Sequence, residues 1–308
     1  MRRPTFLALA IAVAIGLGGC ASGDDNVDKP AGGTPSAAET YAAAGITLDT
    51  RPEKIVSLSP TATEMLFAVG AGKQVTAVDD QSNYPADAPK TNLSGFKPNA
   101  EAIAAKQPDL VVIANDTDKI KDQLTALKIP VYQAAAAVTL DDTYKQLTDV
   151  GALTGHRTEA ADAVKRIKDD IAKLVADAPK HTTKPTYYYE LDPTFYSVTS
   201  KTFIGSLFAM FGLENVADKA DADGSKGGYP QLSGEALIAS DPDLIFLADS
   251  KCCQQSLDTV KARPGFAGVT AVKTGQVVAL DDDIASRWGP RVVDLVHAIA
   301  TAVAKVPA

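Results

Sequence analysis

The sequence holds few of the residues that metal sites and nucleic-acid interfaces depend on. Its 308 residues include three His and three Cys, which is little material for a His-rich metal site. Lys and Arg total 30 against 38 Asp and Glu, which gives a net charge of −8. This acidic balance offers no basic surface to a phosphate backbone, so we expect no nucleic-acid partner.

Motifs of several enzyme classes are missing too. The sequence contains no G-x-S-x-G nucleophile elbow, no H-E-x-x-H zinc motif, no P-loop and no G-x-G-x-x-G. The run Asp281-Asp282-Asp283 follows a predicted strand, and we interpret it as a solvated loop rather than a cation site. We therefore expect no catalytic residues, no metal site and no cofactor, which is typical of a binding protein rather than an enzyme.

A long apolar run occurs only at the N-terminus. An arginine pair precedes an apolar stretch from Phe6 to Leu17, which is too short to cross a membrane and is typical of an export signal. The stretch leads into Leu17-Gly18-Gly19-Cys20, which resembles the lipobox of bacterial lipoproteins. That resemblance implies a signal peptide over residues 1–19, lipidation at Cys20, and an extracytoplasmic protein that meets the membrane through its lipid anchor only. The alternative is an ordinary secretory signal that contains a Cys.

The rest of the chain alternates between short β-rich runs and helical stretches. Residues 20–44 have almost no large apolar side chains, so we interpret them as a flexible tether. Beyond them we predict strands at 54–58, 75–78, 108–113, 130–132, 186–191, 244–248 and 277–280. We predict helices at 61–69, 99–106, 116–127, 202–211, 233–239 and from about 291 onward. This alternation predicts an α/β fold with parallel sheets.

One stretch interrupts the alternation. Residues 156–178 contain no Gly or Pro and repeat apolar residues at helical spacing, which predicts a single amphipathic helix of about 20 residues. We therefore predict an N-terminal lobe over 45–155, a connecting helix over 156–178 and a C-terminal lobe over 179–308.

The two predicted lobes repeat each other in sequence. Residues 99–115 align with 233–249, and seven of the 17 pairs are identical: Glu, Ala, Ala, Pro, Asp, Leu and Ala. Upstream, Leu66-Phe67-Ala68 matches Leu207-Phe208-Ala209 in the same order. We expect two similar α/β lobes with a ligand crevice between them, beyond the carboxyl ends of their strands. The alternative is two unrelated α/β domains.

Several motifs resemble one family. In the first lobe they are Ser57-Leu58-Ser59-Pro60-Thr61-Ala62-Thr63-Glu64, Ser82-Asn83-Tyr84-Pro85 and Glu101…Pro108-Asp109-Leu110-Val111; in the second, Tyr229-Pro230-Gln231-Leu232-Ser233 and Trp288-Gly289-Pro290-Arg291. Over about residues 46–306 the chain resembles the helical-backbone substrate-binding proteins that serve ABC importers of vitamin B12, ferric siderophores and haem. It is most similar to the B12-binding branch.

The resemblance implies a function and a set of partners. We expect a monomer that captures a large chelate and delivers it to an ABC permease dimer with its ATPase. A corrinoid is the favoured cargo, with a ferric siderophore or haem as alternatives and an extracellular metal-dependent hydrolase as the alternative from a different class. Glu101 and Glu235, at matching places in the repeat, are implied to dock on the permease. Alternatively, they only complement helix dipoles.

The resemblance and the loop positions of aromatic residues also suggest which side chains face the ligand. Large flat ligands use aromatic surfaces for contact area, and an Arg fork suits planar acceptors. Position 81 is Gln, where B12 binders often carry Tyr or Trp, and Arg291 is open to a salt bridge instead of a ligand contact. The expected ligand-binding residues are Pro60, Gln81, Tyr84, Phe96, Tyr229, Arg287 and Trp288.

The cysteines divide into one lipidation site and one adjacent pair. Cys252 and Cys253 are the only thiols left once Cys20 is lipidated, in a compartment that favours disulfides. A vicinal disulfide is the favoured interpretation, although adjacent Cα atoms about 3.8 Å apart make it strained. Two free thiols or ligation of a metal or haem iron are the alternatives.

Overall fold

The computed structural model describes residues 40–307, which lie in one compact unit. The predicted signal peptide, Cys20 and almost all of the predicted tether lie outside these residues. Within the described part, no helix is long and apolar enough to cross a membrane.

The first lobe opens with a β-hairpin. Strands β1 (Tyr41–Ala43) and β2 (Ile46–Leu48) pair antiparallel, so the fold begins at Tyr41 rather than at the predicted residue 45. The hairpin was overlooked because each strand has only three residues. The remaining strands and α-helices are β3 (Ile55–Leu58), α1 (Pro60–Ala68), β4 (Val75–Val78), α2 (Ala100–Ala104), β5 (Leu110–Ile113), α3 (Ile120–Ala126), β6 (Val131–Gln133) and α4 (Leu140–Thr154).

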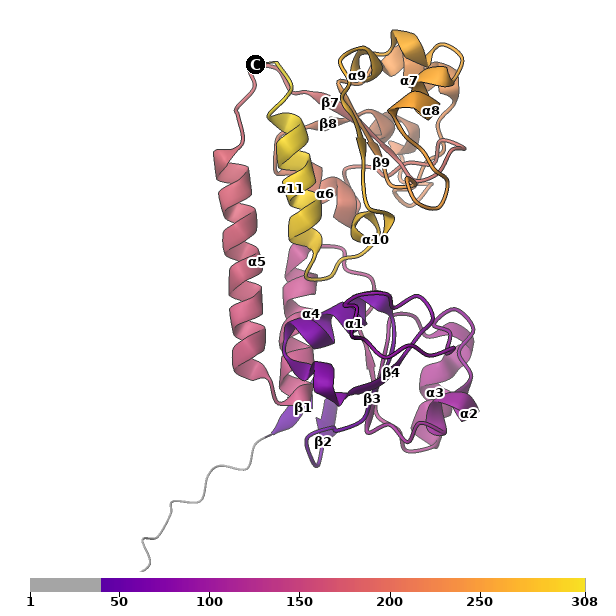
Figure 1. Cartoon of the computed structure of the whole chain (residues 1–308), viewed down its shortest axis with the longest axis vertical. Coiled ribbons are helices and arrows are strands. Elements are labelled where there is room, and N and C mark those ends of the chain that lie inside the picture. Colours follow the sequence, from indigo (N-terminus) through magenta and orange to yellow (C-terminus); the bar gives the residue numbers. More distant parts are fainter. Residues whose placement is uncertain (1–39, 308) are drawn as a thin grey trace, which may run out of the picture. The chain divides into compact units, whose positions relative to one another are not determined.

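The second lobe repeats this plan after the connecting helix α5 (Arg157–Asp177). Its elements are β7 (Thr186–Glu190), α6 (Phe203–Ala209), β8 (Glu214–Asn215), α7 (Gly234–Ser240), β9 (Leu244–Leu247), α8 (Leu257–Ala262), α9 (Thr270–Lys273), β10 (Val277–Ala279), α10 (Asp282–Ala285) and α11 (Val292–Val303). Figure 1 shows the elements from α5 onward in pink to yellow.

The two sheets have the same topology. Each has four parallel strands, in the order β4-β3-β5-β6 in the first lobe and β8-β7-β9-β10 in the second. Taken in chain order, each strand of one sheet therefore has a counterpart at the same position in the other. The sequence repeat matches this correspondence, because residues 99–115 cover α2 and β5 while 233–249 cover α7 and β9. The prediction of two similar α/β lobes is confirmed.

The central strands are almost entirely buried because helices cover both faces of each sheet. All four residues of β3, of β5 and of β9 are buried. Helix α1 starts directly after β3: Ser59 is its N-cap, accepting from the Ala62 N–H, and Pro60 occupies the first turn, where no N–H is needed. This strand-to-helix turn puts Ser59 and Pro60 at the carboxyl edge of the first sheet.

One long helix, α5, connects the lobes and packs against a helix of each. Helix α5 buries Ala160, Ala163, Ile167 and Ile171 on one face and packs against α4 and α11 (Figure 1). It has 21 residues, as its periodicity predicted. Helix α4 was not predicted, although a capping box between Thr139 and Asp142 starts it and Gly155, in the left-handed region at φ 75°, ends it.

Candidate functional site

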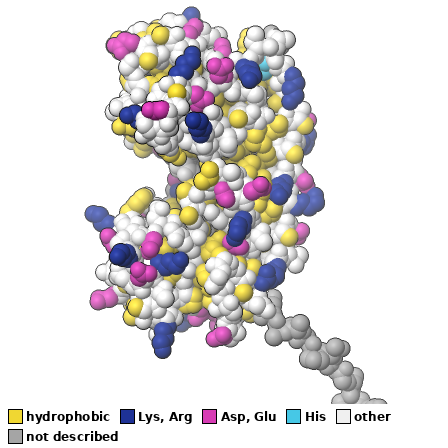
Figure 2. Space-filling view, turned by 180° about the vertical axis from the view of Figure 1, so that it is seen from behind, with side chains coloured by type: hydrophobic (Ala, Val, Ile, Leu, Met, Phe, Trp, Pro, Cys, Tyr) yellow, Lys and Arg dark blue, Asp and Glu magenta, His cyan; other side chains and the backbone are white. Residues whose placement is uncertain are grey.

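A cavity of about 350 Å³ opens at the carboxyl edge of the first sheet. We call it the front cavity; Figure 2 shows the surface hollowed between the two lobes. Its walls follow β3, β4 and β5 in the first lobe and the segment around α10 in the second. The lining residues are Leu58, Ser59, Pro60, Thr61, Asp79, Gln81, Gly95, Phe96, Ala114, Asn115, Asp283, Ser286, Arg287 and Trp288. Both lobes therefore contribute to one site, at the edge where α/β sheets bind ligands.

Five of the seven predicted ligand residues line the front cavity: Pro60, Gln81, Phe96, Arg287 and Trp288. Phe96 is 72% exposed. An aromatic side chain with this much exposed surface packs little against the rest of the described structure, so it is free to contact a ligand.

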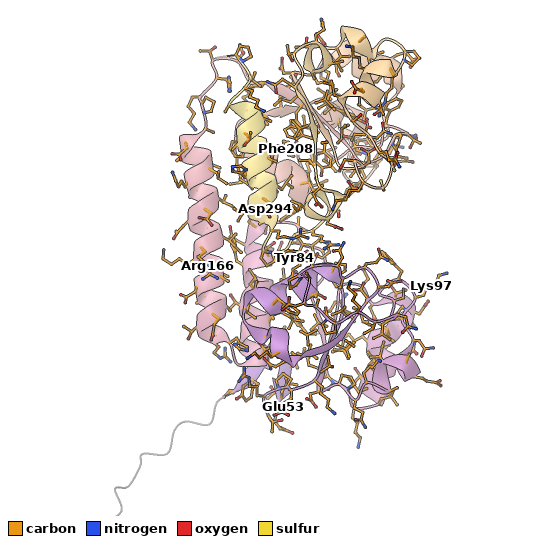
Figure 3. The ribbon with its side chains drawn as sticks, viewed as in Figure 1. Glu53, Tyr84, Lys97, Arg166, Phe208 and Asp294 are labelled. Atoms are coloured by element: carbon orange, nitrogen blue, oxygen red, sulfur yellow. The ribbon has the colours of Figure 1, made fainter. Side chains whose placement is uncertain are left out.

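Tyr84 is not in the front cavity, contrary to expectation. Its ring lies 4.2 Å from the Arg291 guanidinium carbon and lines a second cavity of about 600 Å³, the rear cavity, beside α1, α5 and α11. Figure 3 shows Tyr84 on this side, together with Arg166 and Asp294, which line the same cavity. The reason is local. The preceding Ser82 hydrogen-bonds to Thr63 and Asn83 donates to Asp283, and these contacts direct Tyr84 away from the front cavity.

Tyr229 lies in the other lobe and does not line the front cavity either. It is 51% exposed, in a segment that runs beside residues 195–199 just after the carboxyl end of β7. Tyr196, 41% exposed, is in the neighbouring segment. Two exposed tyrosines thus stand at the carboxyl edge of the second sheet.

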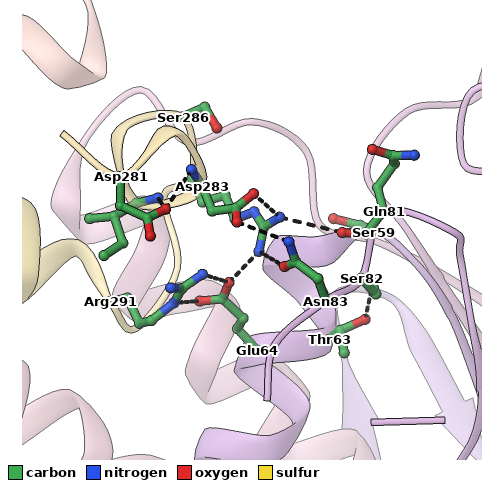
Figure 4. Close-up of polar contacts among 12 residues, drawn as sticks. Ser59, Thr63, Glu64, Gln81, Ser82, Asn83, Asp281, Asp283, Ser286 and Arg291 are labelled. Carbon is green, nitrogen blue, oxygen red and sulfur yellow. Dashed lines mark hydrogen bonds and ion pairs between the residues drawn. The ribbon is translucent and has the colours of Figure 1, made fainter. Parts of the chain in front are cut away.

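An ion cluster joins the two lobes between the front and rear cavities. Glu64, 1% exposed on α1, accepts from Arg291 Nε at 2.9 Å and Nη2 at 2.6 Å, and from Arg287 Nη1 at 2.8 Å. Arg287 also donates to Asp283 at 2.6 Å and to Asn83 at 3.0 Å, and Asn83 donates to Asp283 at 2.9 Å (Figure 4). Such charge-assisted pairs offset the cost of removing these groups from water.

The ion cluster engages the guanidinium of Arg287, which was expected to contact the ligand. Both terminal nitrogens of Arg287 already donate to protein acceptors, so its direct contact with a ligand stays a prediction. Arg291 makes the salt bridge that the sequence left open for it. Glu64 belongs to a motif noted in the sequence, but its pairing was not predicted, because nothing along the chain shows that α1 meets the segment after α10.

Trp288 is fixed in the cavity wall by the opposite lobe. Its indole Nε1 donates to Gln146 Oε1 at 3.1 Å, and its carbonyl accepts from Thr143 at 2.9 Å. Both partners lie on α4. The next residue is Gly289, where a Cβ would come within 3.3 Å of the Thr61 methyl group, so the segment approaches α1 closely.

A buried polar chain lies under the front cavity. Thr63 links Ser57 and Ser82 at 2.9 and 2.8 Å, and Ser82 donates to Asp79. Burial raises the pKa of the Asp79 carboxyl; the hydrogen bond from Ser82 works against that rise. Asp79 was not predicted as a site residue, although its position directly after β4 is where such residues are found.

A second buried acidic group lies at the carboxyl edge of the second sheet. Glu190, fully buried, forms a bidentate pair with Arg263 at 2.7 and 2.6 Å. Asp249, also fully buried, has no hydrogen-bond partner for either carboxylate oxygen. Burial, with the nearby Glu190 charge adding to it, raises the pKa of Asp249 to about 7.

The cysteine pair lies in the loop that Asp249 begins. Cys252 and Cys253 are free thiols in the structure, with their Sγ atoms 2.6 Å apart. Asp282 holds the loop by accepting from the Lys251 and Cys252 N–H groups at 2.9 and 2.8 Å. A vicinal disulfide stays a prediction.

Glu101 and Glu235 occupy matching surface positions. Each lies exposed in the first turn of its helix, α2 or α7, behind an N-cap side chain that accepts from a backbone N–H: Asn99 at 2.8 Å and Ser233 at 3.1 Å. The geometry fits both a docking role and a favourable interaction with the helix dipole.

The described residues do not bring potential metal ligands together. No cluster of three or more His, Cys, Asp or Glu side chains among them has the geometry to hold a metal ion. The run Asp281–Asp283, interpreted from sequence as solvated, instead bonds Lys251, Arg287 and the backbone of the cysteine loop.

Comparison with known proteins agrees with this arrangement. The profile of the family described as "Periplasmic binding protein" matches residues 55–284. A cobalamin-binding protein of Halobacterium salinarum is 31% identical over 266 residues, which cover 83% of this chain and 71% of the relative. The Bacillus subtilis protein YvrC, named an uncharacterized ABC transporter substrate-binding lipoprotein, is 27% identical and covers 98% of this chain and 97% of its own length. A solved periplasmic haem-binding protein from Roseiflexus has a TM-score of 0.71 and 25% identity, covering 82% of this chain and 98% of its own.

Proposed function

The chain belongs to the periplasmic binding protein family, and on that premise we propose that it captures a corrinoid outside the cytoplasm and delivers it to an ABC importer. It is a binding protein and not an enzyme, so the metal-dependent hydrolase considered from sequence is set aside. The observation that carries the proposal is the front cavity, which both lobes line and to which an anchored Trp288 and an exposed Phe96 both contribute.

The front cavity is smaller than a whole corrinoid, so it would receive one edge of the ligand. The flat macrocycle would then lie between the exposed aromatic side chains at the facing carboxyl edges: Phe96 on the first lobe, Tyr196 and Tyr229 on the second. Aromatic surfaces of this kind provide contact area at low entropic cost.

The chemistry of the lining residues favours a corrinoid over haem. None of the 14 residues that line the front cavity is His, Cys, Met or Tyr, the side chains that ligate haem iron, although Tyr196 and Tyr229 on the facing lobe each carry a phenol group. A corrinoid has saturated axial positions and many peripheral amides, which suit the amide and hydroxyl groups of Gln81, Asn115, Ser59 and Ser286. The cobalamin-binding relative supports the same choice.

Delivery to a permease needs a docking surface, and a membrane anchor would keep the protein close to it. We propose that Cys20 is lipidated, which the lipoprotein relative supports, and that Glu101 and Glu235 each contact one subunit of the permease dimer. Their matching exposed positions suit a partner with two equivalent subunits.

Isothermal titration calorimetry tests the cargo. Purified residues 40–308 are titrated with cyanocobalamin, haemin and a ferric catecholate siderophore. Tight, saturable heat with cyanocobalamin alone supports the proposal. Saturation by haemin or the siderophore with none by cyanocobalamin overturns it in favour of an iron importer.

A further inference from the structure

Three charged side chains line the front cavity, and two of them are acids. They are Asp79, Asp283 and Arg287. The one base is already neutralised, since Arg287 donates to Glu64 at 2.8 Å and to Asp283 at 2.6 Å. The charge left facing a ligand is therefore negative and comes from Asp79.

Asp79 is built into the cavity floor with one oxygen free. Its side chain is 3% exposed, and Oδ1 accepts from Ser82. Oδ2 makes no hydrogen bond within the described residues. It lies 3.2 Å from the place a Cβ would take at Gly95, another lining residue, and the Leu58 carbonyl oxygen lies 2.5 Å from that place, so only glycine fits beside this oxygen.

A buried carboxylate with a free oxygen discriminates between ligand groups by charge. It accepts hydrogen bonds from amide N–H groups, and it repels a carboxylate or phenolate brought to the same place, where low dielectric strengthens the repulsion. A buried unpaired acceptor also loses its hydration without compensation when the ligand offers no donor.

We propose that Asp79 makes the front cavity selective for chelates whose edge carries neutral carboxamides, and against chelates whose edge carries anions. This rests on the proposed function and adds the chemical basis of its specificity. Haem propionates and catecholate siderophores belong to the rejected class, and amidated corrinoids to the accepted one.

The surroundings of Asp79 support this assignment. Burial raises the pKa of its carboxyl; Asp80 on the same segment adds to the rise, and Ser82 and Arg287, from the facing lobe, oppose it. Acidification should therefore protonate Asp79 before an ordinary carboxyl, and the rejection of anionic ligands should weaken at lower pH.

The test compares two corrinoids that differ only in their periphery. Kd is measured for cyanocobalamin and for a corrinoid whose peripheral amides have been hydrolysed to carboxylates. The measured quantity is the ratio of the second Kd to the first. Asp79→Asn keeps an acceptor for Ser82 and removes the charge, so we expect the ratio to fall on the order of tenfold. Asp80→Asn is the matched control, because Asp80 is the adjacent acid but exposed and outside the cavity, and we expect its ratio to stay within about twofold.

Each outcome separates the inference from the function it rests on. If the wild-type protein binds neither corrinoid, the proposed function fails. If it binds both and Asp79→Asn leaves the ratio unchanged, or Asp80→Asn changes it equally, the inference fails while the function stands. Should Asp79→Asn not fold, the ratio is measured for Asp79→Ser, which also removes the charge; a ratio that does not fall relative to the wild type contradicts the inference.

Discussion

Glu64 of the first lobe and Arg291 of the second form a two-bond ion pair across 227 positions of sequence, at 2.9 and 2.6 Å. Glu64 is shared with Arg287, and the three side chains separate the front cavity from the rear cavity. The lobes are thus held together by side chains from both, in addition to the connecting helix α5.

Glu64→Gln should destabilise the fold by about 3 kcal/mol, because it leaves two partly buried arginines without their shared carboxylate. The free energy of unfolding from urea denaturation checks this. Asp169→Asn, which removes an exposed i,i+4 pair on α5, is the control and should cost less than about 1 kcal/mol. Equal losses for the two variants would mean that the ion cluster is not what joins the lobes.

Charge reversal at the docking positions should separate transport from binding. Glu101→Arg and Glu235→Arg should each lower uptake by about tenfold and leave the Kd for the ligand unchanged, because both side chains lie on the surface outside the front cavity. Radiolabelled uptake in cells and calorimetry on the purified variants measure the two quantities. Glu53→Arg is the control: it also reverses an exposed charge, but it lies just before the amino end of β3, so it should change neither uptake nor the Kd for the ligand. Loss of affinity in the docking variants would contradict the assignment.

The raised pKa of Asp249 predicts a pH dependence of stability. With a folded pKa of about 7 against an ordinary value of 3.8, the folded state holds the proton more strongly than the unfolded state. Stability from this group is therefore complete below about pH 4 and is lost as pH rises toward about 7.

Asp249→Asn removes this dependence. The slope of unfolding free energy against pH between about 4 and 7 should flatten, and stability at pH 8 should rise by an amount on the order of 2–4 kcal/mol. Asp162→Asn, an exposed acid on α5, should leave the slope as it is. A wild-type slope that is flat over this range would show that Asp249 is satisfied in the folded state.

The intact mass of the protein decides whether Cys252 and Cys253 form a disulfide. If Cys252 and Cys253 form a vicinal disulfide in protein exported by its host, reduction adds two hydrogens to the mass of the chain. The Cys252→Ser variant should show no such change. No mass difference in the exported wild-type protein means that both thiols are free, as they are in the structure.

Much of the fold follows from sequence because its signals are local. Apolar runs predicted β5 and β9, apolar periodicity predicted α5, and the internal repeat predicted that the two lobes share one fold, as their sheets do. Helix α4 carries weaker amphipathic signals, although its capping box at Thr139 and its stop at Gly155 were visible in the sequence.

The site is less predictable because it depends on which loops meet. Pro60, Phe96 and Trp288 were found through motifs and loop aromatics, whereas Tyr84 turned to the rear cavity because its neighbours bond inward. The ion pairs of Glu64 were not predicted and Asp79 was missed, since a buried carboxylate in a helix or after a strand shows its role only when its partners are in place.

Tryptophan fluorescence tests the central claim most directly. Trp288 is the only Trp in the chain and lines the front cavity, so a ligand bound there should quench its emission. We expect cyanocobalamin to quench saturably at one equivalent, and Phe96→Ala to weaken the titration about tenfold through lost aromatic contact. Saturable quenching by haemin or a ferric siderophore, with none by cyanocobalamin beyond its absorbance, would contradict the account.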